Sequence, residues 1–82
     1  MDTSATVSRP YYDWDGREYM EFQIENRNVR VKVPFRYGRV MCHVSGLKTV
    51  QEFQVGEHVQ ITLERKLWDG IEYLVLSSIR EC

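Results

Sequence analysis

Six basic residues and no acidic ones lie between positions 26 and 51 of this 82-residue chain: Arg27, Arg30, Lys32, Arg36, Arg39 and Lys48. The flanks are acidic, with six carboxylates against two bases in residues 1–25 and six against three in residues 52–82. The net charge of −1 therefore averages over a polarised chain. Segregated charge creates a local field that selects partners by sign, so this segment is either a phosphate-binding surface or a solvated face.

Residue types that support catalysis or metal binding do not form a recognisable pattern. Neither His43 nor His58 has a nucleophile and a carboxylate at a telling spacing. Cys42 and Cys82 are far apart in sequence, which gives neither a disulfide framework nor a zinc-ligand spacing. We therefore expect a binding protein rather than an enzyme, with no cofactor, no metal and no small-molecule substrate.

Short alternating segments separated by turn signals predict an all-β fold. The Asp-Gly pairs at 15–16 and 69–70 suit the left-handed dihedral angles of type I′ hairpin turns. The predicted strands cover 19–24, 29–33, 39–44, 58–64 and 71–79, and the last is apolar on both faces. Leu47, Val50 and Phe53 are spaced by three, which predicts one short helix. We expect residues 1–9 to be a flexible tail and residues 10–82 to form a single domain.

Two seven-residue segments are identical at five positions. Trp14-Asp15-Gly16-Arg17-Glu18-Tyr19-Met20 matches Trp68-Asp69-Gly70-Ile71-Glu72-Tyr73-Leu74, and the similarity stops on both sides. We interpret the pair as two hairpins with the same turn, in which the tryptophan packs across the hairpin on the tyrosine.

Five strands with a short helix between the third and the fourth is the order of an OB-fold barrel. The residues from Val40 to Ile79 resemble the back half of an S1-like or initiation-factor-one-like OB domain. The matching segments are Val44-Ser45-Gly46-Leu47, Phe53-Gln54-Val55-Gly56-Glu57-His58-Val59 and Leu74-Val75-Leu76-Ser77. The front half departs from that group, because the usual opening glycines are absent and Trp14-Asp15-Gly16 predicts an extra N-terminal hairpin. The resemblance implies a small five-stranded OB-like barrel.

In such a barrel, single-stranded nucleic acid lies on the exposed side of strands two and three. It also contacts the loop between strands one and two and the loop between strands four and five. Basic side chains follow phosphates there, and exposed aromatic rings stack on bases for roughly 1–3 kcal/mol each. The candidate nucleic-acid-binding residues are Arg27, Arg30, Lys32, Arg36, Tyr37, Arg39, Arg65, Lys66 and Trp68. Arg30 and Lys32 should both point outward, so reversing their charges should cost little stability.

Other interpretations compete with this one. Trp68 could simply pack within its hairpin, and Tyr37 could cap a turn. The acidic flanks and a pI near 6.1 argue against strong binding through phosphates alone. The second hypothesis is a protein–protein adaptor or homodimer of OB or SH3-like fold, which uses the basic stripe and the apolar last strand.

The sequence also gives expectations about location. No apolar run is long enough to cross a membrane, and the polar N-terminus lacks the hydrophobic segment of a secretory signal. We therefore expect an intracellular protein that binds single-stranded DNA or RNA, or a protein partner, and no membrane.

Overall fold

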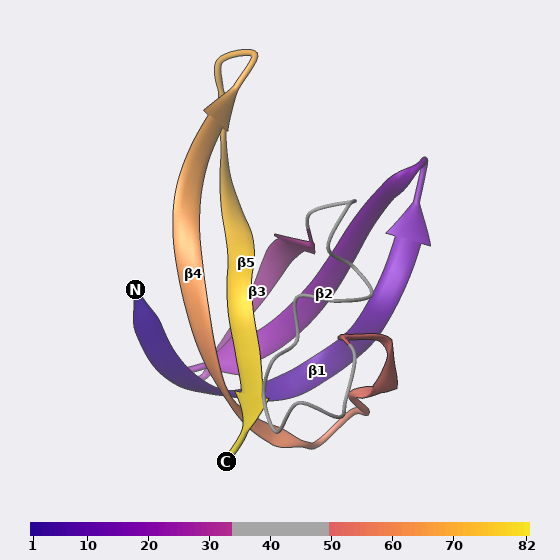
Figure 1. Cartoon of the computed structure of the whole chain (residues 1–82), viewed down its shortest axis with the longest axis vertical. Coiled ribbons are helices and arrows are strands. Elements are labelled where there is room, and N and C mark those ends of the chain that lie inside the picture. Colours follow the sequence, from indigo (N-terminus) through magenta and orange to yellow (C-terminus); the bar gives the residue numbers. More distant parts are fainter. Residues whose placement is uncertain (34–49) are drawn as a thin grey trace.

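The computed structural model describes residues 1–33 and 50–82, which form a five-stranded closed β-barrel (Figure 1). The strands are β1 (Asp2–Trp14), β2 (Arg17–Ile24), β3 (Arg27–Val33), β4 (His58–Trp68) and β5 (Ile71–Glu81). They follow the order β1-β2-β3-β5-β4, and β4 closes the barrel against β1. The β3–β5 pair is parallel and the other pairs are antiparallel. The prediction of an all-β, five-stranded OB-like barrel is confirmed.

The core follows from the two-residue period of the strands. Side chains at alternate positions enter the barrel, as Met20 and Phe22 do on β2 and Val31 and Val33 do on β3. Phe53, which follows the single turn of 3-10 helix η2 (Val50–Glu52), joins the same cluster with no exposed surface. Each such side chain contributes about 1.5–3 kcal/mol by burial, so this small barrel depends on all of them.

Residues 1–9 differ from the sequence expectation of a flexible tail, because residues 2–9 are the first part of β1. Ala5 and Val7 are buried in the core, and β1 is paired with β4 over residues 2–6 and with β2 from Thr6 onward. The Met1 ammonium also donates to the Leu63 carbonyl at 2.8 Å. In sequence, Ala5 and Val7 are two small apolar residues among polar neighbours, and this alternation is too short to predict a strand.

The Trp14–Arg17 hairpin is therefore the β1–β2 hairpin of the barrel itself rather than an addition to it. The strand predicted over 39–44 lies outside the described residues. Of the helix predicted between Leu47 and Phe53, the described residues contain only η2. Within residues 1–33 and 50–82, no helix is long and apolar enough to cross a membrane.

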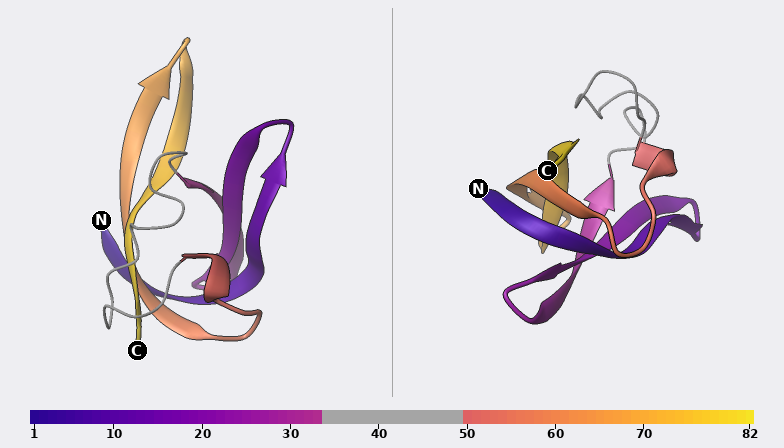
Figure 2. Two further views of the ribbon diagram at one scale, coloured as in Figure 1. Left: turned by 45° about the vertical axis from the view of Figure 1, so that its right-hand side comes forward. Right: turned by 90° about the horizontal axis from the view of Figure 1, so that it is seen from below.

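Two hairpins, β1–β2 and β4–β5, extend as separate arms, and β3 lies between their bases (Figures 1 and 2). Both arms end in the predicted Asp-Gly turn. The φ angles are 56° at Asp15 and 75° at Gly16, and 50° at Asp69 and 78° at Gly70. Two successive positive φ angles define a type I′ turn, whose twist matches that of the strands.

Candidate functional site

The register places one set of side chains on a single outer face of the barrel. Residues directly opposite each other in neighbouring strands project to the same side of a sheet. Tyr12 is opposite Tyr19, and Tyr19 is opposite Lys32, while the neighbouring Met20 and Val31 point into the core. Lys32 is in register with Val75 across the parallel β3–β5 pair. The outer face is therefore continuous from β1 to β5.

The tips of both hairpins extend this face. Trp14 is opposite Arg17 in the first hairpin, and Lys66 is opposite Tyr73 in the second. We call the resulting surface the aromatic–basic face. Its residues are Tyr12, Trp14, Arg17, Tyr19, Arg30, Lys32, Lys66, Trp68 and Tyr73.

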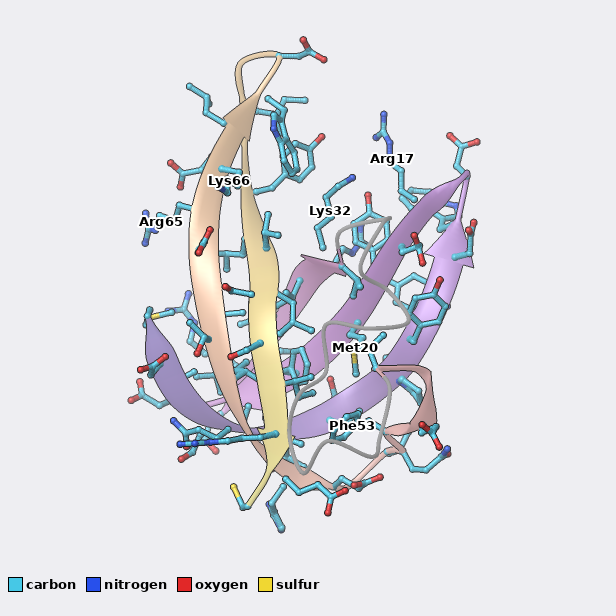
Figure 3. The ribbon with its side chains drawn as sticks, in the orientation of Figure 1. Arg17, Met20, Lys32, Phe53, Arg65 and Lys66 are labelled. Atoms are coloured by element: carbon cyan, nitrogen blue, oxygen red, sulfur yellow. The ribbon has the colours of Figure 1, made fainter. Side chains whose placement is uncertain are left out.

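Lys32 lies at the centre of the aromatic–basic face and connects the two hairpins. Its Nζ atom is 5.4 Å from the ring centroids of both Trp68 and Tyr73, and 5.9 Å from that of Tyr19. Figure 3 shows the Lys32 side chain between the two arms, with Arg17 on the side of the first arm. Distances of about 6 Å or less allow cation–π attraction, so the rings fix the position of this ammonium group.

Arg30, two residues before Lys32 on β3, lies against rings of the first hairpin. Its Cζ atom is 5.5 Å from the Trp14 ring and 5.3 Å from the Tyr19 ring. Tyr19 therefore lies beneath two cations, which explains why its side chain is only 5% exposed on an outer face. Tyr12 packs on it at 5.7 Å between centroids. Tyr19 supports the surface, and a ligand would not reach its ring.

The two indoles are the accessible aromatic groups of the face. Trp14 is 60% exposed and Trp68 is 43% exposed, although Trp68 also packs on Tyr73 with 5.4 Å between centroids. The predicted packing of tryptophan on tyrosine is therefore confirmed in the second hairpin. It leaves nearly half of the indole open, so packing and ligand stacking are compatible.

The carboxylate of Glu21 at the edge of this face already has several partners. It accepts hydrogen bonds from the Tyr12 hydroxyl and from Asn28 Nδ2, each at 2.9 Å, and Arg9 lies 3.8 Å away. Burial, together with this hydrogen bond and the charge of Glu21, raises the pKa of the Tyr12 hydroxyl. Glu64 similarly contacts Lys66 at 3.3 Å. Glu21 and Glu64 therefore reduce the positive field at Arg9 and Lys66.

The two copies of the repeated segment diverge at their glutamates, which lie on the other side of each hairpin. Glu18 is 6% exposed and accepts a hydrogen bond from the Tyr11 hydroxyl through Oε1. Its Oε2 atom has no hydrogen-bond partner among the described residues. Glu72 is instead exposed and pairs with Arg65 at 3.3 Å. The shared feature of the two copies is thus the turn with its tryptophan and tyrosine.

Of the residues predicted from sequence, the structure brings Arg30, Lys32, Lys66 and Trp68 together on the aromatic–basic face. Arg65 is opposite Leu74, so it lies on the reverse side of the β4–β5 hairpin from Lys66, as Figure 3 shows.

Arg27 does not join these residues. It begins β3 beside the β2–β3 turn, roughly 16 Å along the strand from Lys32. Arg36, Tyr37 and Arg39 lie outside the described residues, so their predicted role stays a prediction.

Sequence reasoning missed five residues of the face: Tyr12, Trp14, Arg17, Tyr19 and Tyr73. Four of them belong to the two copies of the repeated segment, which was therefore the available signal. Its importance was hidden because the charge stripe suggested that strands 29–33 and 39–44 carried the site.

A cavity elsewhere on the described surface lacks the features of the aromatic–basic face. A cavity of about 300 Å³ lies at the start of β1, and its lining includes Thr6, Glu25, His58 and Cys82 but no basic side chain other than the histidine. In residues 1–33 and 50–82, no group of three or more His, Cys, Asp or Glu side chains is arranged to hold a metal ion.

These observations define the chain as a small OB-like barrel that carries an aromatic–basic face between two hairpins. Comparisons with models of protein families, with curated proteins and with solved structures gave no match to this chain.

Proposed function

We propose that this protein binds single-stranded nucleic acid on the aromatic–basic face. The observation that supports this most is the position of Lys32, whose ammonium lies between rings of both hairpins and beside an exposed indole. The surface corresponds to the outer side of β2 and β3 flanked by the β1–β2 and β4–β5 turns, where OB barrels hold oligonucleotides. Cations there contact phosphates and indoles stack on bases.

The exposed indoles favour a single strand over a duplex. An indole stacks on the flat face of a base, and that face is already covered by neighbouring bases within a double helix. Because stacking does not depend on base identity, we expect little sequence preference. The net charge of −1 and pI of 6.1 further imply that stacking must contribute a large share of the affinity.

The family resemblance also belongs to the proposal. The Val55-Gly56-Glu57 segment immediately precedes β4, and Gly56 has a φ of 91°, as expected for a tight turn that begins the fourth strand. This agrees with the V-G-[DE]-x-V turn of S1-like and initiation-factor-one-like OB domains. We therefore propose this barrel as a divergent relative of that group.

Fluorescence anisotropy with labelled single-stranded DNA and RNA, measured at several salt concentrations, tests the proposal. Three or four phosphate contacts from Arg17, Arg30, Lys32 and Lys66 predict a log–log salt slope of about −2 to −3. Lys66→Ala should weaken binding and lower this slope by about 0.7. Arg65→Ala, the neighbouring cation on the reverse side, is the matched control and should leave the affinity unchanged.

Trp68→Ala tests the stacking component separately. It should weaken binding about fivefold to a hundredfold at every salt concentration, because stacking is not a charge effect. The control is Leu67→Ala, which removes a 70% exposed apolar side chain from the same hairpin on the opposite side. Equal losses for both variants would contradict a stacking role for Trp68.

The adaptor hypothesis predicts a different outcome. The apolar last strand offers it little, because Val75 and Leu76 are buried and Leu74 is half-buried. Exposed Leu67 and Ile71 at the tip of the β4–β5 hairpin are its remaining support. No binding to any oligonucleotide at low salt, together with a dimer or heterocomplex that survives high salt, would refute nucleic-acid binding and favour the adaptor.

A further inference from the structure

The same pair of chemical groups, an indole of the hairpin and a cation of β3, occurs at the tips of both hairpins. Trp14 stands beside Arg30 at 5.5 Å, and Trp68 stands beside Lys32 at 5.4 Å. Both indoles immediately precede an Asp-Gly turn, and both cations also rest on Tyr19. Each hairpin therefore places one exposed indole beside one cation of β3.

We propose that these are two nucleotide subsites that one short single strand occupies together. In each subsite the indole stacks on a base and the cation binds the adjoining phosphate. The strand then runs from the β1–β2 hairpin to the β4–β5 hairpin across β3. This inference rests on the proposed function and adds to it the number of stacking positions and the ligand's path.

The spacing of the two cations sets the minimum ligand. Arg30 and Lys32 are two residues apart on β3 and project from the same side, so their Cα atoms are separated by roughly 7 Å. That distance suits neighbouring phosphates of an extended single strand. A ligand of about three nucleotides has two internal phosphates for these cations and two outer bases for the indoles.

Joining the two subsites in one ligand should raise affinity steeply with length. Once one base is stacked, the second binds at the high effective concentration that the short connection provides. A mononucleotide can occupy only one subsite at a time. We therefore expect weak binding of thymidine monophosphate, a large gain between dT1 and dT3 or dT4, and a smaller gain per nucleotide beyond that.

The chain contains only two tryptophans, so each subsite has its own fluorescent reporter. In Trp68→Phe the emission comes from Trp14 alone, and in Trp14→Phe it comes from Trp68 alone. Both variants keep an aromatic ring at the changed position. Titration with dT1, dT2, dT3, dT4, dT6 and dT12 should quench both reporters over the same concentration range for dT4 and longer ligands.

Alanine variants measure what each subsite contributes. For dT6, Trp14→Ala and Trp68→Ala should each raise Kd about tenfold or more. In the double variant, Kd should rise by the product of the two single-variant factors. For dT1, each single variant should change Kd by less than about twofold, because the other subsite remains. Leu67→Ala is the control, and far-UV circular dichroism verifies that each variant is folded.

The results separate this inference from the proposed function. If dT6 quenches Trp68 but leaves Trp14 emission unchanged, and Trp14→Ala binds dT6 like the wild type, the two-subsite inference is wrong while nucleic-acid binding stands. A Kd that falls evenly with length from dT1 to dT12 would also refute it. If the unmodified protein binds neither dT12 nor the RNA counterpart at low salt, the proposed function itself fails.

Discussion

Reversing both central cations, Arg30→Glu with Lys32→Glu, should destabilise the fold as well as abolish binding. A surface pair normally costs little to replace, but these side chains rest on four rings. Arg30 lies over Trp14 and Tyr19, and Lys32 lies near Tyr19, Trp68 and Tyr73. The substitution would place carboxylates against the negative faces of these rings.

The magnitude can be worked from these contacts. Each cation is counted once, because all of its ring contacts are made by one charged group. Losing these contacts should lower the free energy of unfolding by about 1 kcal/mol per side chain. Arg30 is also directly opposite Glu21, so the new glutamate adds a like-charge pair worth about 0.2–1 kcal/mol. The free energy of unfolding should therefore fall by about 2–3 kcal/mol. A domain of this length has about 4–12 kcal/mol in total, so the variant should remain folded at room temperature.

Urea unfolding followed by tryptophan fluorescence and by circular dichroism measures this loss, and thermal unfolding should show a Tm lower by roughly 10–20 °C. The matched control is Arg27→Glu with Arg80→Glu, which makes the same change of net charge at two exposed positions away from the face. It should change the stability by no more than about 0.5 kcal/mol per site. Equal losses in both double variants would attribute the effect to net charge and refute the ring contacts.

Three further predictions concern the framework of the site. Gly16→Ala and Gly70→Ala should each lower the free energy of unfolding by about 1–2 kcal/mol, measured by thermal unfolding, because both glycines have a positive φ. No atom lies within 4 Å of the added Cβ, so the cost comes from backbone strain and not from a clash. An unchanged Tm would mean that the turns relax. Phe53→Ala should lower the urea-derived stability by about 3–5 kcal/mol, since the ring is fully buried. Glu21→Gln should lower the raised pKa of Tyr12 toward its ordinary value, as measured by tyrosinate absorbance. In the unmodified protein, the raised pKa of Tyr12 contributes stability that is fully present below the pKa of the unfolded state. That stability is lost as the pH rises through the pKa of the folded state.

Local signals in the sequence were enough to predict β2 to β5 and the two Asp-Gly turns. The Asp-Gly turns need only their own dihedral preferences, and the alternating residues of β2, β3 and β4 report which side is buried. The first strand was missed because its buried residues, Ala5 and Val7, are small and surrounded by polar neighbours. Its order comes from pairing with β4, more than fifty residues away in the chain, which no local pattern reveals.

The candidate site could be predicted only in part, because it depends on register between distant strands. Lys32 was predicted from its charge and outward position, yet its ring neighbours come from β2, β4 and β5. Arg65 and Lys66 looked equivalent because the sequence placed both in a loop after residue 64. The strand β4 instead continues to Trp68, so these two adjacent residues project to opposite sides of the hairpin.

The repeated turn segment links the local pattern to the site. A tryptophan before an Asp-Gly turn and a tyrosine after it can form a stable hairpin tip by themselves. This explanation holds for the second copy, where Trp68 packs on Tyr73, whereas in the first copy Tyr19 packs on Tyr12 instead. The barrel order adds what the sequence could not, because it places β3 between the two hairpins and so gives both tips access to one row of cations. The two similar turns therefore place two exposed indoles beside one row of cations on β3. This arrangement suits a single strand, in which bases that stack alternate with phosphates that bind cations.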